Sequence, residues 1–571
     1  MGTPQDPAPE HADEFARAFP ALADRLARSG DDPDVERLFE GFTALARRVE
    51  RVIDATSLRS VLHFAELLSP EVLRPFPCAT ILELASRRNL RESFAAGAEF
   101  DSVAVDGTRC RFRAHAPFAF VPWRVADAKL AWTQAHGQSL EVGLAPLGTL
   151  RAGESSAPLP LRLHLTGEPR SALLLLAWFQ QHLADAELEV NGVTTPLGRG
   201  AARAWGLRRE EALLPVEPLE HPGFRLLREL MILPAKFAFV EVDGPVLADT
   251  TPASRITLRF RFDTAMPASV RVDADSIRTN CIPVVNVFAT SADPVRPSLE
   301  RPAHPVRPAG IRPQHGEVYS ITGAVALCSN GDRVPVSPVT DFGAAPDEAR
   351  GMFYALERVA SRSGLGVDVS IATTSSSATT VESEIDVLSI DLWATNRGLP
   401  TSLGVGDVRV AAPSSPRGLT FRNVRAITPY RPAAHGEALV WRTLALAALS
   451  ARTLAQRDSI RTLLHALDLH ALSDPQAARA HAQRLEAILE VEATAAVERL
   501  DGSMVRGHDV RVRLSEGSFD GEGEVFLFGQ VLARLFAHEA SLNAFVRTTI
   551  HLVTTGKQFR FPALNGERTI G

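Results

Sequence analysis

The chain has 571 residues, 45% of them hydrophobic and 22% charged, and a formal net charge of −6. These values are typical of a globular protein, and they argue against nucleic acid as a partner, because a nucleic-acid-binding domain is usually clearly basic. The length exceeds that of a single hydrophobic core, so we expect about three or four domains.

The N-terminal region, residues 1–77, is predicted to be helical. Asp32 can cap a helix whose first position is Pro33. Apolar residues then recur at spacings of three and four, which places them on one stripe close to a coiled-coil seam. The stripe is our candidate partner-bundle face: Val35, Leu38, Phe42, Leu45, Val49 and Val52. For part of the stripe we favour packing against the second predicted helix, Leu58–Leu68, and the alternative is a bundle with another chain.

The middle of the chain is predicted to consist of two β-rich domains. Residues 78–245 contain alternating segments such as "TRCRFRAHA" and "LRLHLTG", interrupted by one helix at about Ser171–Asp185. Residues 246–430 contain "RITLRFRFD" and "ASVRVDAD", and prolines are dense from Pro294 to Pro313, which predicts an extended arm.

Residues 431–571 are predicted to form a C-terminal α+β domain. Two helices are expected in "ALVWRTLALAALSARTLAQRDSIRTLLHALDL", and strands near Leu489–Val497 and His508–Leu514. In "GEVFLFGQVLARLFAHEASLNAF" we expect a strand end that leads into an amphipathic helix. The predicted fold class is therefore α+β and multidomain.

The cysteines and the apolar segments predict a cytoplasmic protein. Cys78, Cys110, Cys281 and Cys328 are scattered and form no CxxC pair, which is typical of free thiols in a reducing compartment. "MGTPQDPAPEHADEF" lacks the basic and apolar regions of a signal peptide. The longest apolar run, "SALLLLAWFQ", is shorter than the roughly 18 residues that span a membrane. We expect no direct membrane insertion.

No segment specifies an active site. None of the lysines, Lys129, Lys236 and Lys557, has the glycine-rich context of a P-loop. His538-Glu539 lacks a second histidine, because Leu542 stands where the other zinc ligand would be. A GxSxG elbow is also missing from the sequence. We predict no catalytic residue, no cofactor or nucleotide, and no metal.

The segment "SIRTNCIPVVNVFATSADPVR", residues 276–296, raises the question of what Cys281 does. A nucleophilic cysteine needs a cation or a helix N-terminus that lowers its pKa, and Arg278 is a nearby cation. However, Pro283, Val284 and Val285 predict a buried strand, where cysteine usually acts as a small hydrophobe. We therefore predict a structural role for Cys281.

A series of segments resembles, in order, the TssF family, a baseplate component of the bacterial type VI secretion system. They run from about Glu14 to the C-terminus: "EFARAFPALADRL", "DPDVERLFEGFTALARRVE", "LLSPEVLRPFPCATI", "CRFRAHAPFAFVPWRV", "LRLHLTG", "LPAKFAFVEVDG", "RTNCIPVVNVFATSADPVR", "DLWATNRGLP" with "GVGDV", and "VRGHDVRV" with "GEVFLFGQVLARLFAHEASLNAF". The resemblance implies that "RTNCIPVVNVF" is a core strand, in which Asn280 and Asn286 satisfy backbone groups at the strand ends.

The resemblance also implies a structural protein rather than an enzyme. Family members form wedges with TssG, with two TssF copies expected around one TssG, and the wedges also carry TssK and TssE. The hub, the spike and the membrane complex are reached indirectly, so the expected location is the cytoplasmic side of the inner membrane. The assembly is expected to anchor the contractile sheath and to trigger it.

One departure and two alternatives stay open. Many relatives begin with a further helix that carries a tyrosine-rich stretch, and "MGTPQDPAPEHADEF" does not resemble it, which puts the contacts of that helix in doubt. One alternative is a wedge protein of a phage-like extracellular contractile injection particle. The other is a carbohydrate- or peptide-processing enzyme built from β-domains.

Overall fold

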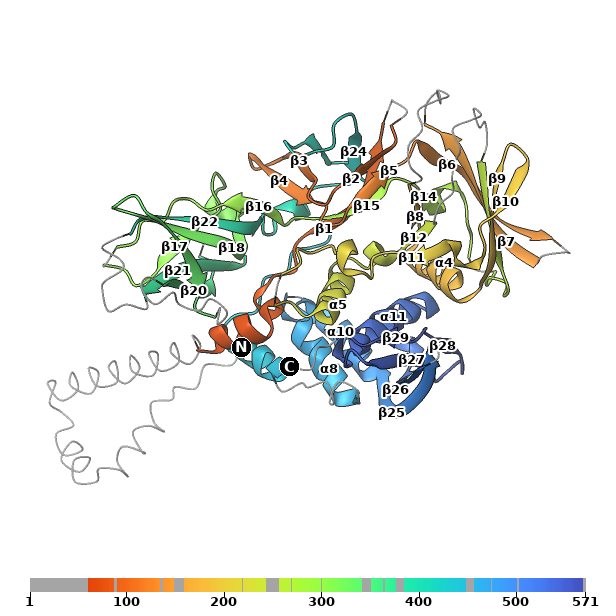
Figure 1. Ribbon diagram of the computed structural model, residues 1–571. Coiled ribbons are helices and arrows are strands. Elements are labelled where there is room, and N and C mark those ends of the chain that lie inside the picture. Colours follow the sequence, from red (N-terminus) through yellow and green to blue (C-terminus); the bar gives the residue numbers. More distant parts are fainter. Residues whose placement is uncertain are drawn as a thin grey trace, which may run out of the picture. The chain divides into compact units, whose positions relative to one another are not determined.

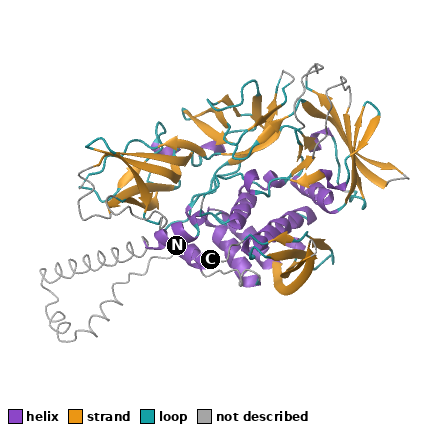
Figure 2. Cartoon of the chain, viewed as in Figure 1, coloured by secondary structure: helices purple, strands orange, loops and turns teal. Residues whose placement is uncertain are grey.

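The structure is a computed structural model, and it describes residues 60–86, 90–133, 137–147, 159–217, 219–242, 256–268, 270–298, 300–340, 351–362, 365–375, 385–447, 456–473, 475–500 and 503–567. The chain divides into two compact units, residues 1–63 and 64–571. Strands dominate the described residues of the second unit, and helices are concentrated in its C-terminal part (Figure 2). This mixture of helices and sheets is consistent with the predicted α+β class.

The central sheet is built from three distant parts of the chain. Its strands are ordered β23 (Val408–Ala411), β3 (Glu99–Val105), β4 (Thr108–Arg113), β15 (Cys281–Val285), β1 (Ala79–Ala85) and β24 (Thr420–Asn423). β1 and β15 are apolar and almost wholly buried, as expected for strands that are covered on both faces. The two are antiparallel, with Ala79 opposite Val285.

A second sheet, the arm sheet, carries the proline-rich segment. Its strands are ordered β16 (Phe288–Ser291), β22 (Ile385–Thr395), β18 (Glu317–Cys328), β19 (Arg333–Pro338), β20 (Met352–Ala360), β21 (Val367–Ser375) and β17 (His304–Val306). Apolar and less buried residues alternate along β20, so that Met352, Tyr354 and Leu356 face a core shared with β21 and β22. The 3-10 helix η6 (Pro313–His315) precedes β18.

Two further sheets surround helix α4 (Pro169–Gln181). One has the order β10 (Val193–Pro196), β9 (Leu183–Val190), β13 (Ile256–Phe262), β7 (Gly137–Pro146) and β6 (Trp123–Thr133). The other has the order β11 (Ala202–Ala204), β12 (Phe239–Val242), β8 (Leu161–Leu165) and β14 (Ile277–Arg278). Phe179 of α4 packs edge-on against Phe260 of β13 at 4.9 Å between ring centroids. β2 (Glu92–Phe94) and β5 (Phe118–Phe120) form a separate two-stranded antiparallel sheet.

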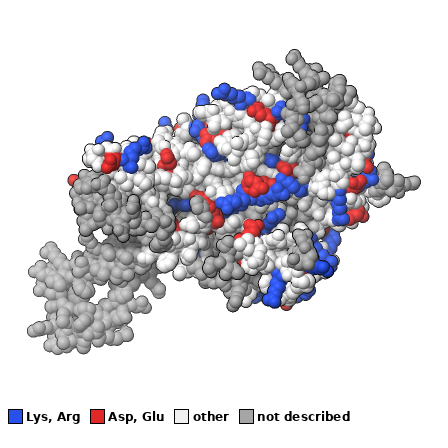
Figure 3. Space-filling model, viewed as in Figure 1, with Lys and Arg blue, Asp and Glu red and all other residues white. Residues whose placement is uncertain are grey.

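The outward faces of these sheets are covered by ion pairs. Arg259 on β13 contacts the carboxylates of Glu141, Glu187 and Glu189 on its two neighbouring strands, at 3.1 to 3.4 Å. On the face drawn in Figure 3, basic and acidic side chains lie next to one another in the same way. Cross-strand pairs of opposite charge stabilise a solvated sheet face.

In the C-terminal part of the chain, four helices of the described residues come before the sheet, and a fifth connects two of its strands (Figure 1). They are α6 (Glu437–Ala447), α8 (Arg457–Leu467), α9 (His470–Ser473), α10 (Pro475–Ala487) and α11 (Glu522–Glu539). The strands are β25 (Ile488–Leu500), β26 (Ser503–Leu514), β27 (Ala544–Leu552), β28 (Gln558–Arg560) and β29 (Leu564–Asn565). β26 and β27 are parallel, and α11 supplies the crossover that parallel strands need.

Helix α11 joins the C-terminal segment to the rest of the unit. It packs on α4 and on α5 (Pro222–Ile232). At each of the two contacts a glycine lets the helices approach closely. A Cβ on Gly523 would lie 2.3 Å from the backbone nitrogen of Leu174, and a Cβ on Gly223 would lie 2.6 Å from Leu535. His221 and Glu539 add an ion-pair contact of 2.8 Å between the two segments.

Most of the expected strands are confirmed. The described residues of "ASVRVDAD" form no strand and end in the 3-10 helix η5 (Ala274–Ser276). Two helix predictions are also wrong in detail. β4, β8, β13, β25 and β26 lie where alternation predicted them. The helix expected to reach Asp185 ends at Gln181, because "LADAELEV" alternates and pairs with β13 as β9. The strand end expected at "GEVFLF" is helical from Glu522, because both of its apolar faces are buried, one against α4 and α5 and the other against β27.

The predicted domain boundaries stay a prediction. Within the second unit, sheets take strands from both sides of the expected boundary at 245: β13 pairs with β7, and β15 pairs with β1. The stripe Val35, Leu38, Phe42, Leu45, Val49 and Val52 lies outside the described residues.

We predict that Gly523→Ala weakens the packing of α11 on α4. The added Cβ would meet backbone atoms of Leu173 and Leu174, which cannot rotate away, so the cost should be about 1–3 kcal/mol. Thermal unfolding followed by circular dichroism should show a lowered midpoint. Gly517→Ala is the control, because nothing lies within 4 Å of a Cβ there. Equal midpoints for the two variants would mean that the close approach is not required.

Candidate functional site

Cys281 lies in the middle of the central sheet and is 3% exposed. Its backbone pairs with Glu83 on β1, and burial raises the pKa of its thiol. A thiol that is harder to ionise is a poor nucleophile and a poor ligand. The structure thus confirms the buried strand predicted for this segment, and it gives Cys281 the role of a small hydrophobe.

Asn280 uses its side chain to join two segments of backbone. Its φ of 54° is unusual for a residue other than glycine, and its amide is turned into the interior. The side-chain oxygen accepts a hydrogen bond from the Val121 amide at 2.9 Å, and the side-chain nitrogen donates to the Val121 carbonyl at 2.9 Å and to the Trp123 carbonyl at 3.2 Å. Asn280 therefore holds the start of β6 beside β15, and it satisfies backbone groups at a strand end, as the family resemblance implied.

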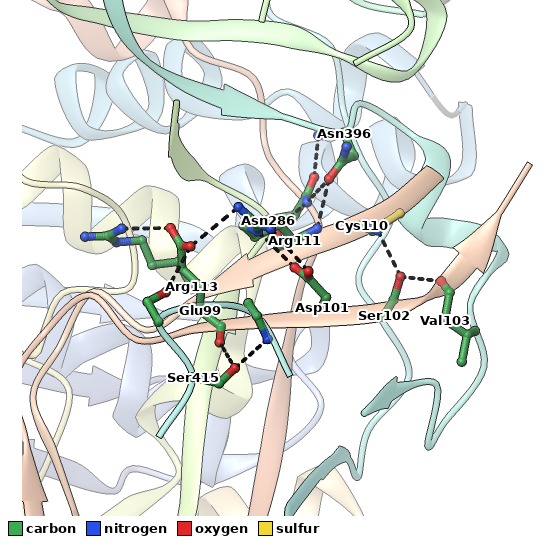
Figure 4. Close-up of polar contacts among 12 residues, drawn as sticks. Glu99, Asp101, Ser102, Val103, Cys110, Arg111, Arg113, Asn286, Asn396 and Ser415 are labelled. Carbon is green, nitrogen blue, oxygen red and sulfur yellow. Dashed lines mark hydrogen bonds and ion pairs between the residues drawn. The ribbon is translucent and has the colours of Figure 1, made fainter. Parts of the chain in front are cut away.

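Asn286 and Asn396 form a buried pair between the central sheet and the arm sheet (Figure 4). The Asn286 side-chain nitrogen donates to the Asn396 side-chain oxygen at 2.8 Å and to the Arg111 carbonyl at 2.7 Å. In return, the Asn396 amide donates to the Asn286 side-chain oxygen at 2.7 Å. The Asn396 side chain also accepts from the Arg111 amide at 3.1 Å and donates to the His315 carbonyl at 3.2 Å.

Arg397 extends this junction into the arm sheet. Its guanidinium donates to the Gly316 carbonyl at 2.7 Å, to the Leu365 carbonyl at 2.9 Å and to the Asp368 carboxylate at 2.7 Å. The side chain is 5% exposed. We call Asn286, Asn396 and Arg397 the sheet junction. Its polar groups bond mainly to backbone, so it fixes the ends of strands and η6 relative to one another.

Charged side chains on the central sheet flank the sheet junction. Arg111 forms a two-point contact with Asp101, at 2.9 and 3.2 Å, and Arg113 contacts Glu99 at 2.9 Å (Figure 4). The guanidinium of Arg113 lies 5.0 Å from the ring centroid of Trp393 on β22, which adds a cation–π contact between the two sheets.

A second buried network, the ionic junction, surrounds α5. It consists of Glu71, Arg74, Glu217, Glu220, Arg225, Arg228, Glu229, Lys236 and Arg358. Glu229 is fully buried; it contacts Lys236, and it accepts from the amides of Leu213 at 2.8 Å and Leu214 at 3.1 Å. Burial alone would raise the pKa of this carboxyl, but Lys236 and Arg225 hold it below its usual value.

The ionic junction ties the 3-10 helix η1 (Pro70–Leu73) to its surroundings. Arg228 donates to the Pro75 carbonyl at 3.0 Å, and Arg358 of the arm sheet donates to the Leu73 carbonyl at 3.5 Å. Arg74 pairs with Glu217 at 2.9 Å. The pKa of Glu220 is raised to about 8, mainly by burial and further by the nearby Glu71 and Glu229.

The side chains of the two junctions bond largely to backbone groups and so position strand ends, η1 and α5. Among the described residues, no group of three or more histidine, cysteine or acidic side chains is placed to hold a metal. The helices of the described segments include none that is long and apolar enough to cross a membrane. The sequence missed Asn396, Arg397 and the ionic junction, because buried polar residues carry no periodic signal; the only hint was the pair of polar residues that follows the apolar end of β22 in "WATNRGLP".

The chain is similar to known proteins over its whole length. The family model described as "Type VI secretion system, TssF" matches residues 9–568. A curated relative, the type VI secretion system component TssF1 of Pseudomonas aeruginosa, is 29% identical over 623 aligned positions, which cover 98% of this chain and 97% of that protein.

Two solved structures share the fold. One chain of the TssK-TssF-TssG baseplate subcomplex of the type VI secretion system, determined by cryo-electron microscopy, has a TM-score of 0.73 at 23% identity, and the match covers 94% of this chain and 100% of that one. One chain of the baseplate complex from the type VI secretion system has a TM-score of 0.56 at 20% identity, with 99% and 98% covered.

We predict that Asn286→Ala destabilises the chain by roughly 2–4 kcal/mol. The variant leaves the Arg111 carbonyl and the Asn396 amide buried without their partner, and each such group costs about 1–3 kcal/mol. Differential scanning calorimetry should show a lowered unfolding midpoint. Asn330→Ala is the control, because Asn330 bonds to Asp332 on an exposed turn. Similar midpoints for both variants would contradict the role of the sheet junction.

Glu220→Gln should change how stability depends on pH. The folded pKa of about 8 lies above the ordinary value of 4.5, so the folded chain keeps this proton where the unfolded chain releases it. The contribution of Glu220 to stability is full below about pH 4.5 and is lost as the pH rises to about 8. Because glutamine stays neutral, the variant should gain stability over the wild type between these pH values, by at most several kcal/mol.

The unfolding midpoints of wild type, Glu220→Gln and the exposed control Glu210→Gln should therefore be compared at pH 5 and pH 8. We expect the Glu220→Gln midpoint to rise relative to that of wild type at pH 8, and the Glu210→Gln midpoint to follow wild type. A Glu220→Gln difference that is the same at both pH values would contradict the assigned burial of the carboxyl.

Proposed function

The chain belongs to the TssF family of type VI secretion system baseplate proteins, and from this we propose that it works as a structural subunit of the baseplate wedge. The observation that carries the proposal is the family match over residues 9–568. The match is to the secretion system, so it does not favour an extracellular injection particle. A non-enzymatic role is part of the proposal, and it is supported by the structural task of the family.

The proposed partners are TssG and TssK. The support is the TssK-TssF-TssG subcomplex, whose similar chain is covered completely by the match. We extend the proposal to TssE and to a second TssF copy in each wedge, and to a location at the cytoplasmic face of the inner membrane. The division into a helical N-terminal region, two β-rich domains and a C-terminal α+β domain belongs to the same proposal.

The geometry of the sheet junction supports the proposal that this subunit transmits force within the wedge. A wedge must hold a loaded sheath and then pass on a change of conformation without covalent links. The sheet junction suits this task, because the buried residues Asn286 and Asn396 connect two sheets through hydrogen bonds of 2.7 and 2.8 Å. Arg397 distributes the same connection over three further points on the arm sheet.

The proposal is tested by coexpression with the TssG and TssK proteins encoded in the same gene cluster. We expect the three chains to co-elute in size-exclusion chromatography, with their stoichiometry measured by native mass spectrometry. A chain that elutes alone in the presence of both folded partners would contradict the wedge assignment.

We further propose that Val35, Leu38, Phe42, Leu45, Val49 and Val52 form the face that binds TssG. Phe42→Asp places a charge in the middle of this stripe. If the stripe meets the partner, the isolated variant should fold normally and lose co-purification with TssG. If it packs within the chain, the variant should lose helical circular dichroism, because an unpaired buried charge costs several kcal/mol.

Thr43→Asp is the matched control for Phe42→Asp, since it adds the same charge one position off the stripe. It should fold and bind TssG as wild type does. A Phe42→Asp variant that folds and still binds fully would defeat both assignments, and Phe42 would then face solvent.

A further inference from the structure

The proline-rich arm between β16 and β18 carries a repeated dipeptide. Arg296, Arg301, Arg307 and Arg312 are each followed directly by proline, and successive arginines are five, six and five residues apart. We call these four residues the arm arginines. Proline fixes φ near −65°, so each arginine is attached to a segment of backbone that has little conformational freedom.

The arm is fixed to the arm sheet along its length. The Asp293 amide donates to the Arg307 carbonyl at 2.8 Å, and the Ala309 amide donates to the Ser291 carbonyl at 2.9 Å. Val295 pairs with Leu388 on β22 through two hydrogen bonds, of 2.7 and 3.2 Å. Further along, β17 pairs with β21. The arm is thus an ordered edge of the sheet over its described residues.

The side chains of the arm are sorted by direction. Val295 is 6% exposed and Val306 4% exposed, and both belong to the core of the arm sheet. The arm arginines are all exposed. The valines therefore anchor the arm, and the arm arginines lie on its exposed side.

Several arginines of the sheets are in ion pairs, whereas the arm arginines, like Arg124 on β6 and Arg409 on β23, are in none that the described residues form. On the sheet faces, Arg111, Arg259 and Arg547 all contact acidic side chains. In the described part of the chain, none of the arm arginines is in an ion pair, although Asp293 and Glu300 belong to the same segment. Within the described residues, their side chains form a hydrogen bond from the Arg312 guanidinium to the Asp106 carbonyl, at 3.3 Å.

We propose that the arm is a docking strip for an acidic, extended segment of another baseplate subunit. Guanidinium groups bind carboxylates in a planar, two-point geometry, and a row of them held on a fixed backbone matches a chain with recurring aspartate or glutamate. A net charge of −6 for the whole chain makes this strip a local exception. The inference rests on the proposed function only for the identity of the occupant as a baseplate subunit.

A protein segment suits the strip better than a lipid surface does. Binding at a membrane interface usually needs exposed aromatic or aliphatic side chains beside the basic ones. The exposed large hydrophobic residues of the described chain include none between 292 and 313. The described residues of the arm present charged side chains at regular intervals along a proline-rich backbone. They present no large apolar side chain that could insert among acyl chains.

Cross-linking through introduced lysines can identify the segment that binds the arm. The experiment suits this chain because it contains few lysines. The three lysines are Lys129, Lys236 and Lys557, and Lys236 is fully buried, so the background of reactive amines is low. Arg301→Lys/Arg307→Lys keeps the charge of the strip and adds two amines. After coexpression with TssG and TssK, a water-soluble carbodiimide should link positions 301 and 307 to an acidic segment of one of these two subunits.

The matched control is Arg199→Lys/Arg417→Lys, which adds two amines at exposed positions outside the arm. It should give no link to the acidic segment found with the arm variant. Links from the arm lysines only to Asp293 or Glu300 of the same chain, or none beyond the control, would overturn the proposal.

A binding measurement on the isolated full-length chain tests the strip without any partner. The probe is a fluorescein-labelled oligoglutamate peptide, followed by anisotropy at low and at physiological salt. Replacing all four arm arginines by glutamine should weaken binding by roughly tenfold to a hundredfold, and salt should weaken the wild type more than the variant.

The control variant replaces Arg124, Arg199, Arg409 and Arg417 by glutamine, because these are exposed and lie outside the arm. An equal loss in both variants would overturn the proposal, since it would reflect net charge alone. Wild-type binding to vesicles of anionic phospholipid that depends on the arm arginines, with no binding to oligoglutamate, would overturn it in favour of a lipid surface. Failure of the chain to co-elute with TssG and TssK would refute the wedge assignment while leaving this peptide measurement valid.

Discussion

A polar group that is taken out of water must find a partner, and the connection between the two largest sheets depends on this constraint. Asn286 and Asn396 are 110 residues apart in the chain, and each satisfies the amide groups of the other at 2.7 to 2.8 Å. The same side chains bond to both the amide and the carbonyl of Arg111. The central sheet draws its strands from residues 79–113, 281–285 and 408–423, and the junction closes where these segments meet the arm sheet.

The two buried networks differ in how completely their polar groups are satisfied by hydrogen bonds. In the sheet junction, the side-chain amide atoms of Asn286 and Asn396 all have partners. In the ionic junction, Glu71, Arg74, Glu220 and Arg358 each keep at least one buried polar atom without a hydrogen bond. A polar network whose groups are all satisfied holds them in one arrangement.

Much of the local structure could be predicted from the sequence. The contacts that connect distant segments could mostly not be predicted. Alternation predicted β8 and β13, and the proline density predicted the arm, because both signals depend on neighbouring residues. The burial of Cys281 followed from its apolar neighbours. Asn286 could be assigned to a strand end, but its partner Asn396 could not be identified, since nothing local marks which distant amide a buried asparagine will meet. Helix α11 was partly misassigned for a similar reason: its N-terminal turn is shaped by the fit of Gly523 against α4.

Hydrogen–deuterium exchange read out by mass spectrometry at single-amide resolution tests the central claim most directly. The amides of Arg111, Asn286 and Asn396 donate to the Asn396 side chain, the Cys78 carbonyl and the Asn286 side chain. If the sheet junction couples the two sheets, these amides should exchange as slowly as those of the β18–β22 ladder, and Asn286→Ala should accelerate all three together. Exchange of the Asn396 amide at the rate of the Asp332 amide in its exposed turn would show that the sheets move independently and would contradict the account.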